Sequence, residues 1–228
     1  MLASKPNDIV YPDSDGKPMA DNTLQFQWIV TLKENLDARR PDFVAGNLLW
    51  YPVEGQPKIR QAPDVLVAIG RPKGYRGSYL QWREGGVAPQ VVFEILSPGN
   101  RRKEKQRKFS FYQTYGIEEL YVYDPDHETL QGWLRDSNGL QEVERMNGFI
   151  SPRLGIRFQH GETLHVFHAN GEPFQTVSEI VARADEEKAR ADNEKARADE
   201  EKTRADREQA RAEALAHRLR ELGIELPD

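Results

Sequence analysis

The chain has 228 residues, of which 38% are apolar and 30% are charged, and its formal net charge is −5. This apolar content is enough for one sizeable core, and residues 178–228, with 11 Lys and Arg against 15 Asp and Glu, carry most of the net charge. The chain has no cysteine, which excludes disulfides, thiolate zinc sites and cysteine nucleophiles.

The N-terminal part of the chain predicts a loop followed by a helix. Residues 1–11 lack the apolar core of a signal peptide, and no stretch approaches the roughly 18 apolar residues of a membrane helix, so we expect a cytoplasmic protein without a membrane partner. Residues 11–20 are rich in Pro, Asp and Gly, which is typical of a loop. Asp21 or Asn22 can then cap a helix whose apolar residues recur at three- and four-residue spacing: Leu24, Trp28, Ile29, Leu32 and Leu36.

The middle of the chain predicts several strands and one helix. Strands are expected over residues 43–50, 64–69, 91–96 and 120–123, with a long Gly- and Pro-rich loop over 70–90 and a helix over about 102–115. The turn signal at 136–139 predicts a hairpin of residues 129–135 and 140–145, and two more strands are expected near 155–159 and 163–168. This order indicates an α/β (α+β) fold in which helices flank a mixed β-sheet.

From about residue 178 the sequence becomes a charged seven-residue repeat, in which Arg-Ala recurs at 183, 190, 197, 204 and 211. Ala, Glu, Lys and Arg favour helix, and opposite charges at helical neighbour spacing add support. The alanines are two or five residues apart, so the repeat lacks the apolar seam of a coiled coil. We therefore expect a domain over residues 1–177 and one charged helix over 178–228. The helix is interpreted as a solvated stalk, with a weak coiled coil or a partner-docking helix as the alternative.

Two acidic residues stand in apolar strands, where a buried carboxylate needs a partner. Asp64 begins one strand after Pro63, and Glu94 lies inside another. If the two strands are neighbours, both carboxylates converge on one point. Oxygen ligands of this kind suit Mg²⁺ or Mn²⁺.

A basic helix follows Glu94 in the sequence. Glu104, Lys108 and Tyr112 share one side of this helix at four-residue spacing, so Lys108 can project into the carboxylate site. Four further cations would meet phosphates at the rim: Arg101, Arg102, Lys103 and Lys105. By spacing alone, a structural ion pair between Glu94 and Lys108 is the commoner explanation of this pattern.

The motifs taken together resemble those of a known family. Pro63-Asp64, VVFEILSPGN, the helix with Lys108 and Tyr112, and YGIEELYVYDP resemble the Uma-type family of putative restriction endonucleases, in the PD-(D/E)XK nuclease superfamily. The resemblance runs from about Tyr11 to the segment MNGFISPRLGIRF, and the charged C-terminal helix looks like a common attachment. It implies a restriction-endonuclease-like fold and the hydrolysis of DNA phosphodiester bonds.

The resemblance also implies roles for single residues. Asp64 and Glu94 match the two acids of the motif and would bind Mg²⁺ (or Mn²⁺), together with the backbone carbonyl of Ile95. Leu96 stands where the motif has its lysine, and Lys108 matches the position on the following helix to which the family moves that lysine, with Lys105 as the runner-up. An acid of the first helix often completes such sites. Here that helix offers Gln25 and Gln27, with Asp21 only at its start. Gln25 and Tyr112 are candidates to support the ligands from behind.

We therefore expect a Mg²⁺-dependent endodeoxyribonuclease that acts on DNA, and the alternative is a catalytically inactive nucleic-acid-binding or regulatory module with the same fold. The resemblance also implies a homodimer, because nucleases of the superfamily often work as dimers and cutting two strands needs two sites. The charged helix could dock a protein partner. In the loop 70–90, Lys73, Arg76 and Arg83 either contact a nucleic-acid backbone or only keep the loop soluble. Trp82, in the same loop, is the one tryptophan that we consider as a stacking platform.

Overall fold

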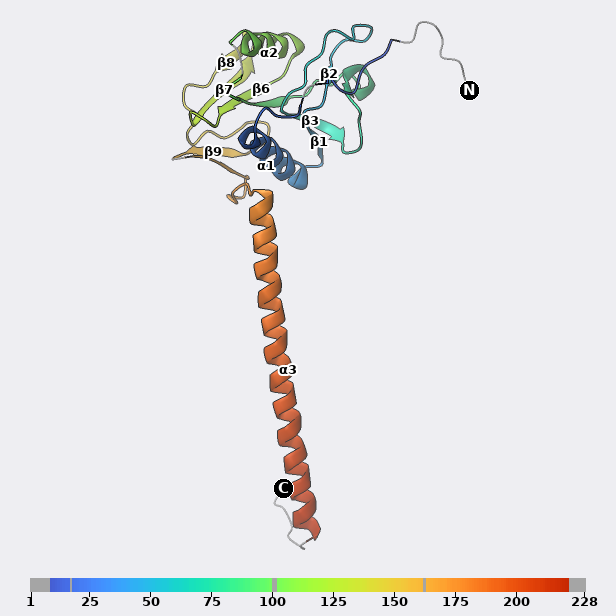
Figure 1. Cartoon of the computed structure of the whole chain (residues 1–228), viewed down its shortest axis with the longest axis vertical. Coiled ribbons are helices and arrows are strands. Elements are labelled where there is room, and N and C mark those ends of the chain that lie inside the picture. The colour runs from blue at the N-terminus through green and yellow to red at the C-terminus, as the bar shows by residue number, and fades with distance from the viewer. Residues whose placement is uncertain (1–8, 17, 100–101, 162, 222–228) are drawn as a thin grey trace, which may run out of the picture. The chain divides into compact units, whose positions relative to one another are not determined.

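A computed structural model describes residues 9–16, 18–99, 102–161 and 163–221 of the chain (Figure 1). The chain divides into two compact units, Met1–Thr176 and Val177–Asp228. The first unit has a six-stranded mixed sheet flanked by helices, and the second contains one long helix. The predicted fold class is confirmed.

The sheet of the first unit has the strand order β1-β3-β5-β6-β7-β8. Neighbouring strands are antiparallel, except that β5 and β6 are parallel because helix α2 (Arg102–Tyr115) connects them. The bounds of its strands are β1 Asp42–Gly46, β3 Val65–Pro72, β5 Val91–Ile95, β6 Glu119–Asp124, β7 Thr129–Asp136 and β8 Gly139–Glu142.

Two layers cover the sheet, one on each face. Helix α1 (Thr23–Arg39) and the hairpin of β9 (Arg157–His160) and β10 (Leu164–Phe167) pack on the face that presents Val65 and Val67. Helix α2 packs on the opposite face, which presents Leu66 and Ala68. Because β3 and β5 are buried on both faces, their sequences are almost continuously apolar. An acid in either strand is therefore conspicuous.

The two helices of the first unit begin and end where local chemistry indicates. Asn22 caps α1, its side-chain oxygen accepting from the Gln25 N–H at 2.8 Å. Gly116 follows α2 with a φ of 87°, a left-handed conformation that favours glycine. Both helices thus agree with the sequence prediction.

The strand predicted over 43–50 is two strands. The chain leaves β1 at Asn47, whose φ is 50°, and then forms β2 (Trp50–Tyr51). Strand β2 pairs in parallel with β4 (Tyr79–Leu80), which lies inside the predicted loop 70–90 and is followed by a 3₁₀ helix at Gln81–Glu84. The sequence did not indicate this pairing because it joins residues almost thirty positions apart through only two residue pairs.

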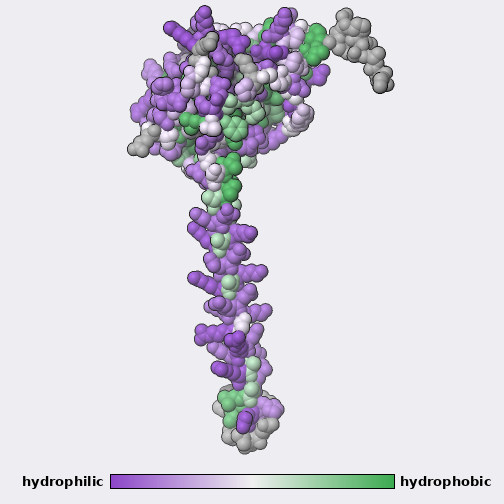
Figure 2. All heavy atoms as spheres, in the orientation of Figure 1, coloured by the Kyte–Doolittle hydropathy of each residue, from purple (hydrophilic) through white to green (hydrophobic). Residues whose placement is uncertain are grey.

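The second unit is helix α3 (Val177–Glu221), whose described side chains from Val177 to Leu215 are all exposed. Ion pairs at four-residue spacing join Arg183 to Glu187 at 3.0 Å and Arg204 to Glu208 at 3.1 Å. Figure 2 shows its surface as mainly hydrophilic, with small apolar patches at intervals. In the described part of the chain, no helix is long and apolar enough to cross a membrane.

Candidate active site

The register of β3 and β5 brings Asp64 and Glu94 together. Val65 is paired with Phe93 in this antiparallel ladder, so one further step places Asp64 opposite Glu94. Opposed residues of antiparallel strands point to the same face with Cβ atoms about 5 Å apart. Both acids are buried, with 6% and 5% of their surface exposed. The predicted convergence of the two carboxylates is present in the structure.

Asp64 lies in a site that disfavours its ionised form. Its Oδ2 accepts a hydrogen bond from the Ile95 N–H at 2.6 Å. Burial, and after it the neighbouring Glu94 carboxylate, raise the pKa of Asp64 well above its usual value, although Lys108 and the Ile95 N–H act in the opposite direction. One cation is therefore not enough to balance the two acids.

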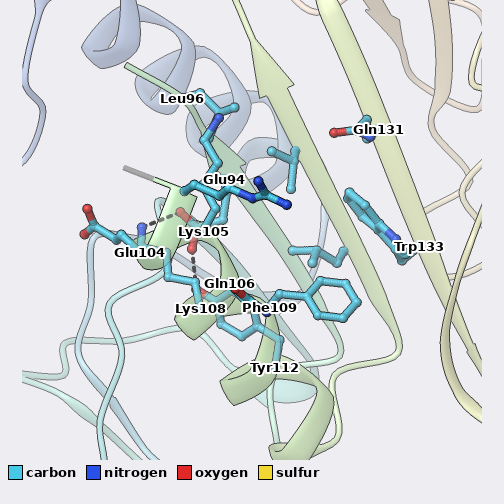
Figure 3. A pocket seen from close by; sticks show the side chains of 13 residues that line it. Glu94, Leu96, Glu104, Lys105, Gln106, Lys108, Phe109, Tyr112, Gln131 and Trp133 are labelled. Carbon is cyan, nitrogen blue, oxygen red and sulfur yellow. Dashed lines mark hydrogen bonds and ion pairs between the residues drawn. The ribbon is translucent and has the colours of Figure 1, made fainter. Parts of the chain in front are cut away.

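Helix α2 supplies two partners for Glu94, one from each of two successive turns. The Lys108 Nζ lies 2.6 Å from the Glu94 Oε2, and the buried Tyr112 hydroxyl donates to the Oε1 (Figure 3). Burial acts to lower the pKa of Lys108, but Glu94 and Asp64 outweigh it and the pKa is raised. Burial and the Glu94 charge also raise the pKa of Tyr112. Lys108 is therefore a cation at neutral pH, and Tyr112 is a neutral hydrogen-bond donor.

The first turn of α1 reaches the same place from the other side of the sheet. The Gln25 Nε2 donates to the Ile95 carbonyl at 2.7 Å, and its Oε1 accepts from the Asp21 N–H at 2.8 Å. The Ser97 hydroxyl donates to the Asp21 Oδ2 at 2.5 Å. Gln25 therefore holds the very carbonyl that is predicted as a ligand. Asp21, which the sequence places only at the start of the first helix, is an acid at the site.

Two pockets adjoin the carboxylate pair, and both are lined by Glu104 and Lys108. The polar pocket has a volume of about 900 Å³ and includes Asp64. Its further charged residues are Asp13, Asp15, Asp21, Lys58, Arg60 and Arg107. The apolar pocket has a volume of about 370 Å³ and includes Glu94. Its apolar lining is formed by Leu96, Phe109, Leu120, Val122 and Trp133.

The predicted phosphate-binding residues lie in different places. Arg102 and Lys105 line the apolar pocket, and Lys103 is exposed on α2 and lines neither of the two pockets. Arg101 lies outside the described residues. Leu96, at the position of the motif lysine, also lines the apolar pocket. The cation that contacts Glu94 is Lys108 rather than Lys105.

The basic residues of the polar pocket were not among the predicted site residues. Lys58 and Arg60 come from the connection after β2, which carried no motif. Arg107 belongs to the basic helix but was not predicted as a phosphate-binding residue. The Arg107 Nη2 lies 3.4 Å from the Gln61 Oε1. The position of Arg107, one residue before Lys108 in the basic helix, was a local indication that it lies near the site. No local feature of the sequence distinguished Lys58 and Arg60 from other surface cations.

Two of the basic residues named in the loop 70–90, Lys73 and Arg76, are engaged within the fold. The Lys73 Nζ pairs with Asp37 at 3.0 Å, and the Arg76 guanidinium pairs with Glu84 at 2.6 Å and covers the Phe43 ring. Trp82 packs against Tyr11. These contacts favour a structural role for that loop.

The side chains around Asp64 fit a hard divalent cation. Mg²⁺ commonly binds proteins through one or two carboxylates and completes its shell with water and substrate phosphate. Asp64, Glu94 and the Ile95 carbonyl offer such a set. A divalent cation would offset the burial, and after it the Glu94 charge, that raise the pKa of Asp64. Within the described ranges, no group of three or more His, Cys, Asp and Glu is arranged to hold a metal. The fit thus rests on two carboxylates.

Comparison with known proteins places the first unit among nuclease-like proteins. The family model Uma2, described as a putative restriction endonuclease, matches residues 15–173. Among solved structures, a putative nuclease belonging to DUF820 from Anabaena variabilis ATCC 29413 is 16% identical, with a TM-score of 0.39 over 57% of this chain and 69% of that chain. No curated protein matches the sequence.

Proposed function

We propose that this chain, which belongs to the Uma2 family of putative restriction endonucleases, is a metal-dependent endonuclease that hydrolyses DNA phosphodiester bonds. The observation that carries the proposal is the meeting of Asp64, Glu94 and Lys108 at one point beside a charged pocket. Two buried acids that share one cation destabilise a fold, so their presence indicates a purpose other than stability. Binding a divalent metal ion is such a purpose.

Each residue of the site has a role in this proposal. Asp64, Glu94 and the Ile95 carbonyl would hold Mg²⁺ or Mn²⁺, which when bound supplies Lewis-acid stabilisation of charge on a phosphoryl oxygen. Lys108, kept protonated by the two acids, cannot act as a base at neutral pH and instead stabilises negative charge that develops at phosphorus. Tyr112 orients Glu94, and Gln25 orients the Ile95 carbonyl.

The DNA backbone would follow the basic residues on either side of this point. Lys58, Arg60 and Arg107 line the polar pocket, and Arg102 and Lys105 line the apolar pocket. Contacts of Lys and Arg with phosphates provide affinity that does not depend on base sequence. Lys103 and Arg101 extend the basic segment of the sequence and are proposed to contribute in the same way.

A specific observation favours the second candidate, a catalytically inactive nucleic-acid-binding module. Both carboxylate oxygens of Glu94 have partners within the chain, Lys108 and Tyr112, and the Ile95 carbonyl accepts from Gln25. In an inactive module these contacts would be the whole purpose of the buried acids. In an enzyme they must coexist with a metal ion or give way to it.

Cleavage of supercoiled plasmid with Mg²⁺ or Mn²⁺ tests the proposal. The wild type should nick the plasmid, and Asp64→Ala and Glu94→Ala should lose this activity, while a variant of an exposed acid, Asp126→Ala, should keep it. Equal nicking by the wild type and the two site variants would refute the catalytic role. Calorimetric titration with Mn²⁺ separates the two candidates, because only the enzyme requires binding that is lost in Asp64→Ala.

We further propose that the functional protein is a homodimer, since cleavage of both DNA strands needs two sites. Helix α3 would be a solvated stalk, and the alternative is a weak coiled coil or a helix that docks a protein partner. Sedimentation of the full chain and of residues 1–177 tests both ideas. A full chain that sediments as a monomer refutes the homodimer, and a dimer that is lost with the helix refutes the stalk.

A further inference from the structure

The two pockets beside the carboxylate pair differ in chemistry. The polar pocket contains Asp64 and is lined mainly by charged and polar side chains, whereas the apolar pocket contains Glu94 and has an apolar floor. Lys108 and Glu104 line both pockets. A nucleic acid strand, whose charged sugar–phosphate backbone carries bases with apolar faces, has this same division into charged and apolar parts. One nucleotide can thus meet both pockets at once.

The apolar pocket has the features of a site for a flat ring. Leu120 and Val122 of the sheet form its floor, and two aromatic side chains also line it, Phe109 from α2 and Trp133 from β7 (Figure 3). Their ring centroids are 5.6 Å apart at an interplanar angle of 70°. This edge contact holds the half-buried indole in a fixed orientation. Aromatic side chains held in this way are the usual platforms for nucleobases.

Polar groups surround the apolar floor. Gln131 stands at the pocket on β7, where its Nε2 donates to the Glu142 Oε1 at 3.1 Å, and Arg102 and Lys105 stand on α2. An amide can read the edge of a base, and the two cations suit the phosphates that flank it. A purely aliphatic ligand would leave these groups without a use. The volume of about 370 Å³ lies near the lower end of ligand pockets and suits one base rather than several.

We propose that the apolar pocket binds a single nucleobase, unstacked from its neighbours, of the strand whose phosphate lies at Lys108. This inference rests on the proposed function and adds a subsite to it. A stacked base in a duplex cannot enter a pocket between a helix and a sheet, so the base must come from a single strand or be extruded from the duplex. Trp133 and Phe109 contact the base, and Gln131 reads its edge.

Binding of two single strands of roughly 12 nucleotides, within the range of known single-strand sites, tests the proposal on the full-length protein in EDTA, where no cleavage occurs. One fluorescein-labelled strand has a mixed base sequence, and the other has the same number of phosphates with an abasic sugar at every position. By fluorescence anisotropy, the wild type should bind the base-bearing strand about 10-fold more tightly, as expected for one stacked base. In Trp133→Leu this preference should vanish, with the affinity for the abasic strand unchanged.

Two further variants make the test specific. Val122→Phe fills the pocket from its floor without removing the tryptophan, and it should abolish the preference in the same way. Trp82→Leu removes a tryptophan that lines neither of the two pockets and should keep the preference. Circular dichroism and thermal unfolding of each variant check that it is folded.

Different failures have different meanings. Equal binding of the two strands by the wild type would overturn the base pocket and leave the proposed nuclease function standing. A preference that persists in both Trp133→Leu and Val122→Phe would also overturn it, because the base would then lie elsewhere. If neither strand binds and plasmid is not cut with Mg²⁺, the proposed function fails and the pocket proposal falls with it.

Discussion

Replacement of Lys108 by methionine is the most informative single perturbation of the site. Methionine keeps the length and apolar stem of the side chain but removes the charge that lies 2.6 Å from Glu94. The Lys108 and Glu94 side chains are 19% and 6% exposed, so solvent screens the pair only weakly. Loss of one partner of such a pair leaves a buried charge without compensation and costs about 3–5 kcal/mol. For a unit of this size we expect a fall in Tm of roughly 10 °C.

The loss should depend on pH in a defined direction. Without Lys108, which acts to lower it, the folded-state pKa of Asp64 rises further above its unfolded value, which is near 4. A folded pKa that is raised above the unfolded one makes stability fall as pH rises from about 4 through the folded pKa. Lys108→Met should therefore be much less stable than the wild type at pH 7 and nearly as stable at pH 4.

Urea unfolding followed by tryptophan fluorescence at both pH values measures this effect. Lys105→Met, on the exposed side of the same helix, is the matched control and should change the free energy of unfolding by less than about 0.5 kcal/mol. The double variant Glu94→Gln with Lys108→Met should recover most of the loss because the excess charge is gone. Mg²⁺ should stabilise Lys108→Met if the acids can hold a metal. Equal stability of Lys108→Met and wild type at pH 7 would refute the reasoning.

Three further predictions concern the neighbours of Lys108. Asp64→Asn should be more stable than the wild type at neutral pH, because the raised pKa of Asp64 makes wild-type stability fall as pH rises from about 4. Urea unfolding across this pH range would show that the variant lacks this fall, and a less stable variant would contradict the prediction. Tyr112→Phe removes the buried donor to the Glu94 Oε1 and should lower the free energy of unfolding by about 1–3 kcal/mol in the same assay. Tyr115→Phe is the control and should lower it by less, and similar losses would count against the orienting role of Tyr112. Gln25→Leu breaks the link between the Ile95 carbonyl and the Asp21 N–H, so thermal unfolding should report a loss of about 1–2 kcal/mol, and an unchanged Tm would argue against it.

Lys108 shows how tertiary structure can bring a cation to an acid when the adjacent sequence lacks one. Leu96 occupies the expected position two residues after Glu94, and its side chain lines the apolar pocket. Lys108, from the next helix, places its Nζ at the Glu94 Oε2 instead. The electrostatic effect of a charge depends on its position in space, so a helix packed over the strand can supply the charge as well as the strand itself. The exchange also leaves an apolar wall next to the acids.

Much of the fold and the candidate acids could be predicted from the sequence. The apolar periodicity of α1, the Asn22 cap and Gly116 after α2 are local signals, because helix formation depends on neighbours within one or two turns. Asp64 and Glu94 were conspicuous because burying a carboxylate in an apolar strand is costly, whatever the partner strand. The continuous charged helix from about residue 178 followed from composition alone.

What only the tertiary structure decided is which distant residues meet. The pairing of Val65 with Phe93 sets Asp64 opposite Glu94, and a slip by one residue would have turned one of them to the other face. The Gln25 bond to the Ile95 carbonyl spans 70 residues, and Arg60 reaches the polar pocket from a connection without a motif. Local patterns of apolar and polar residues predict which side chains are buried. The partners across the site depend on strand register and helix packing, which no short stretch of sequence encodes.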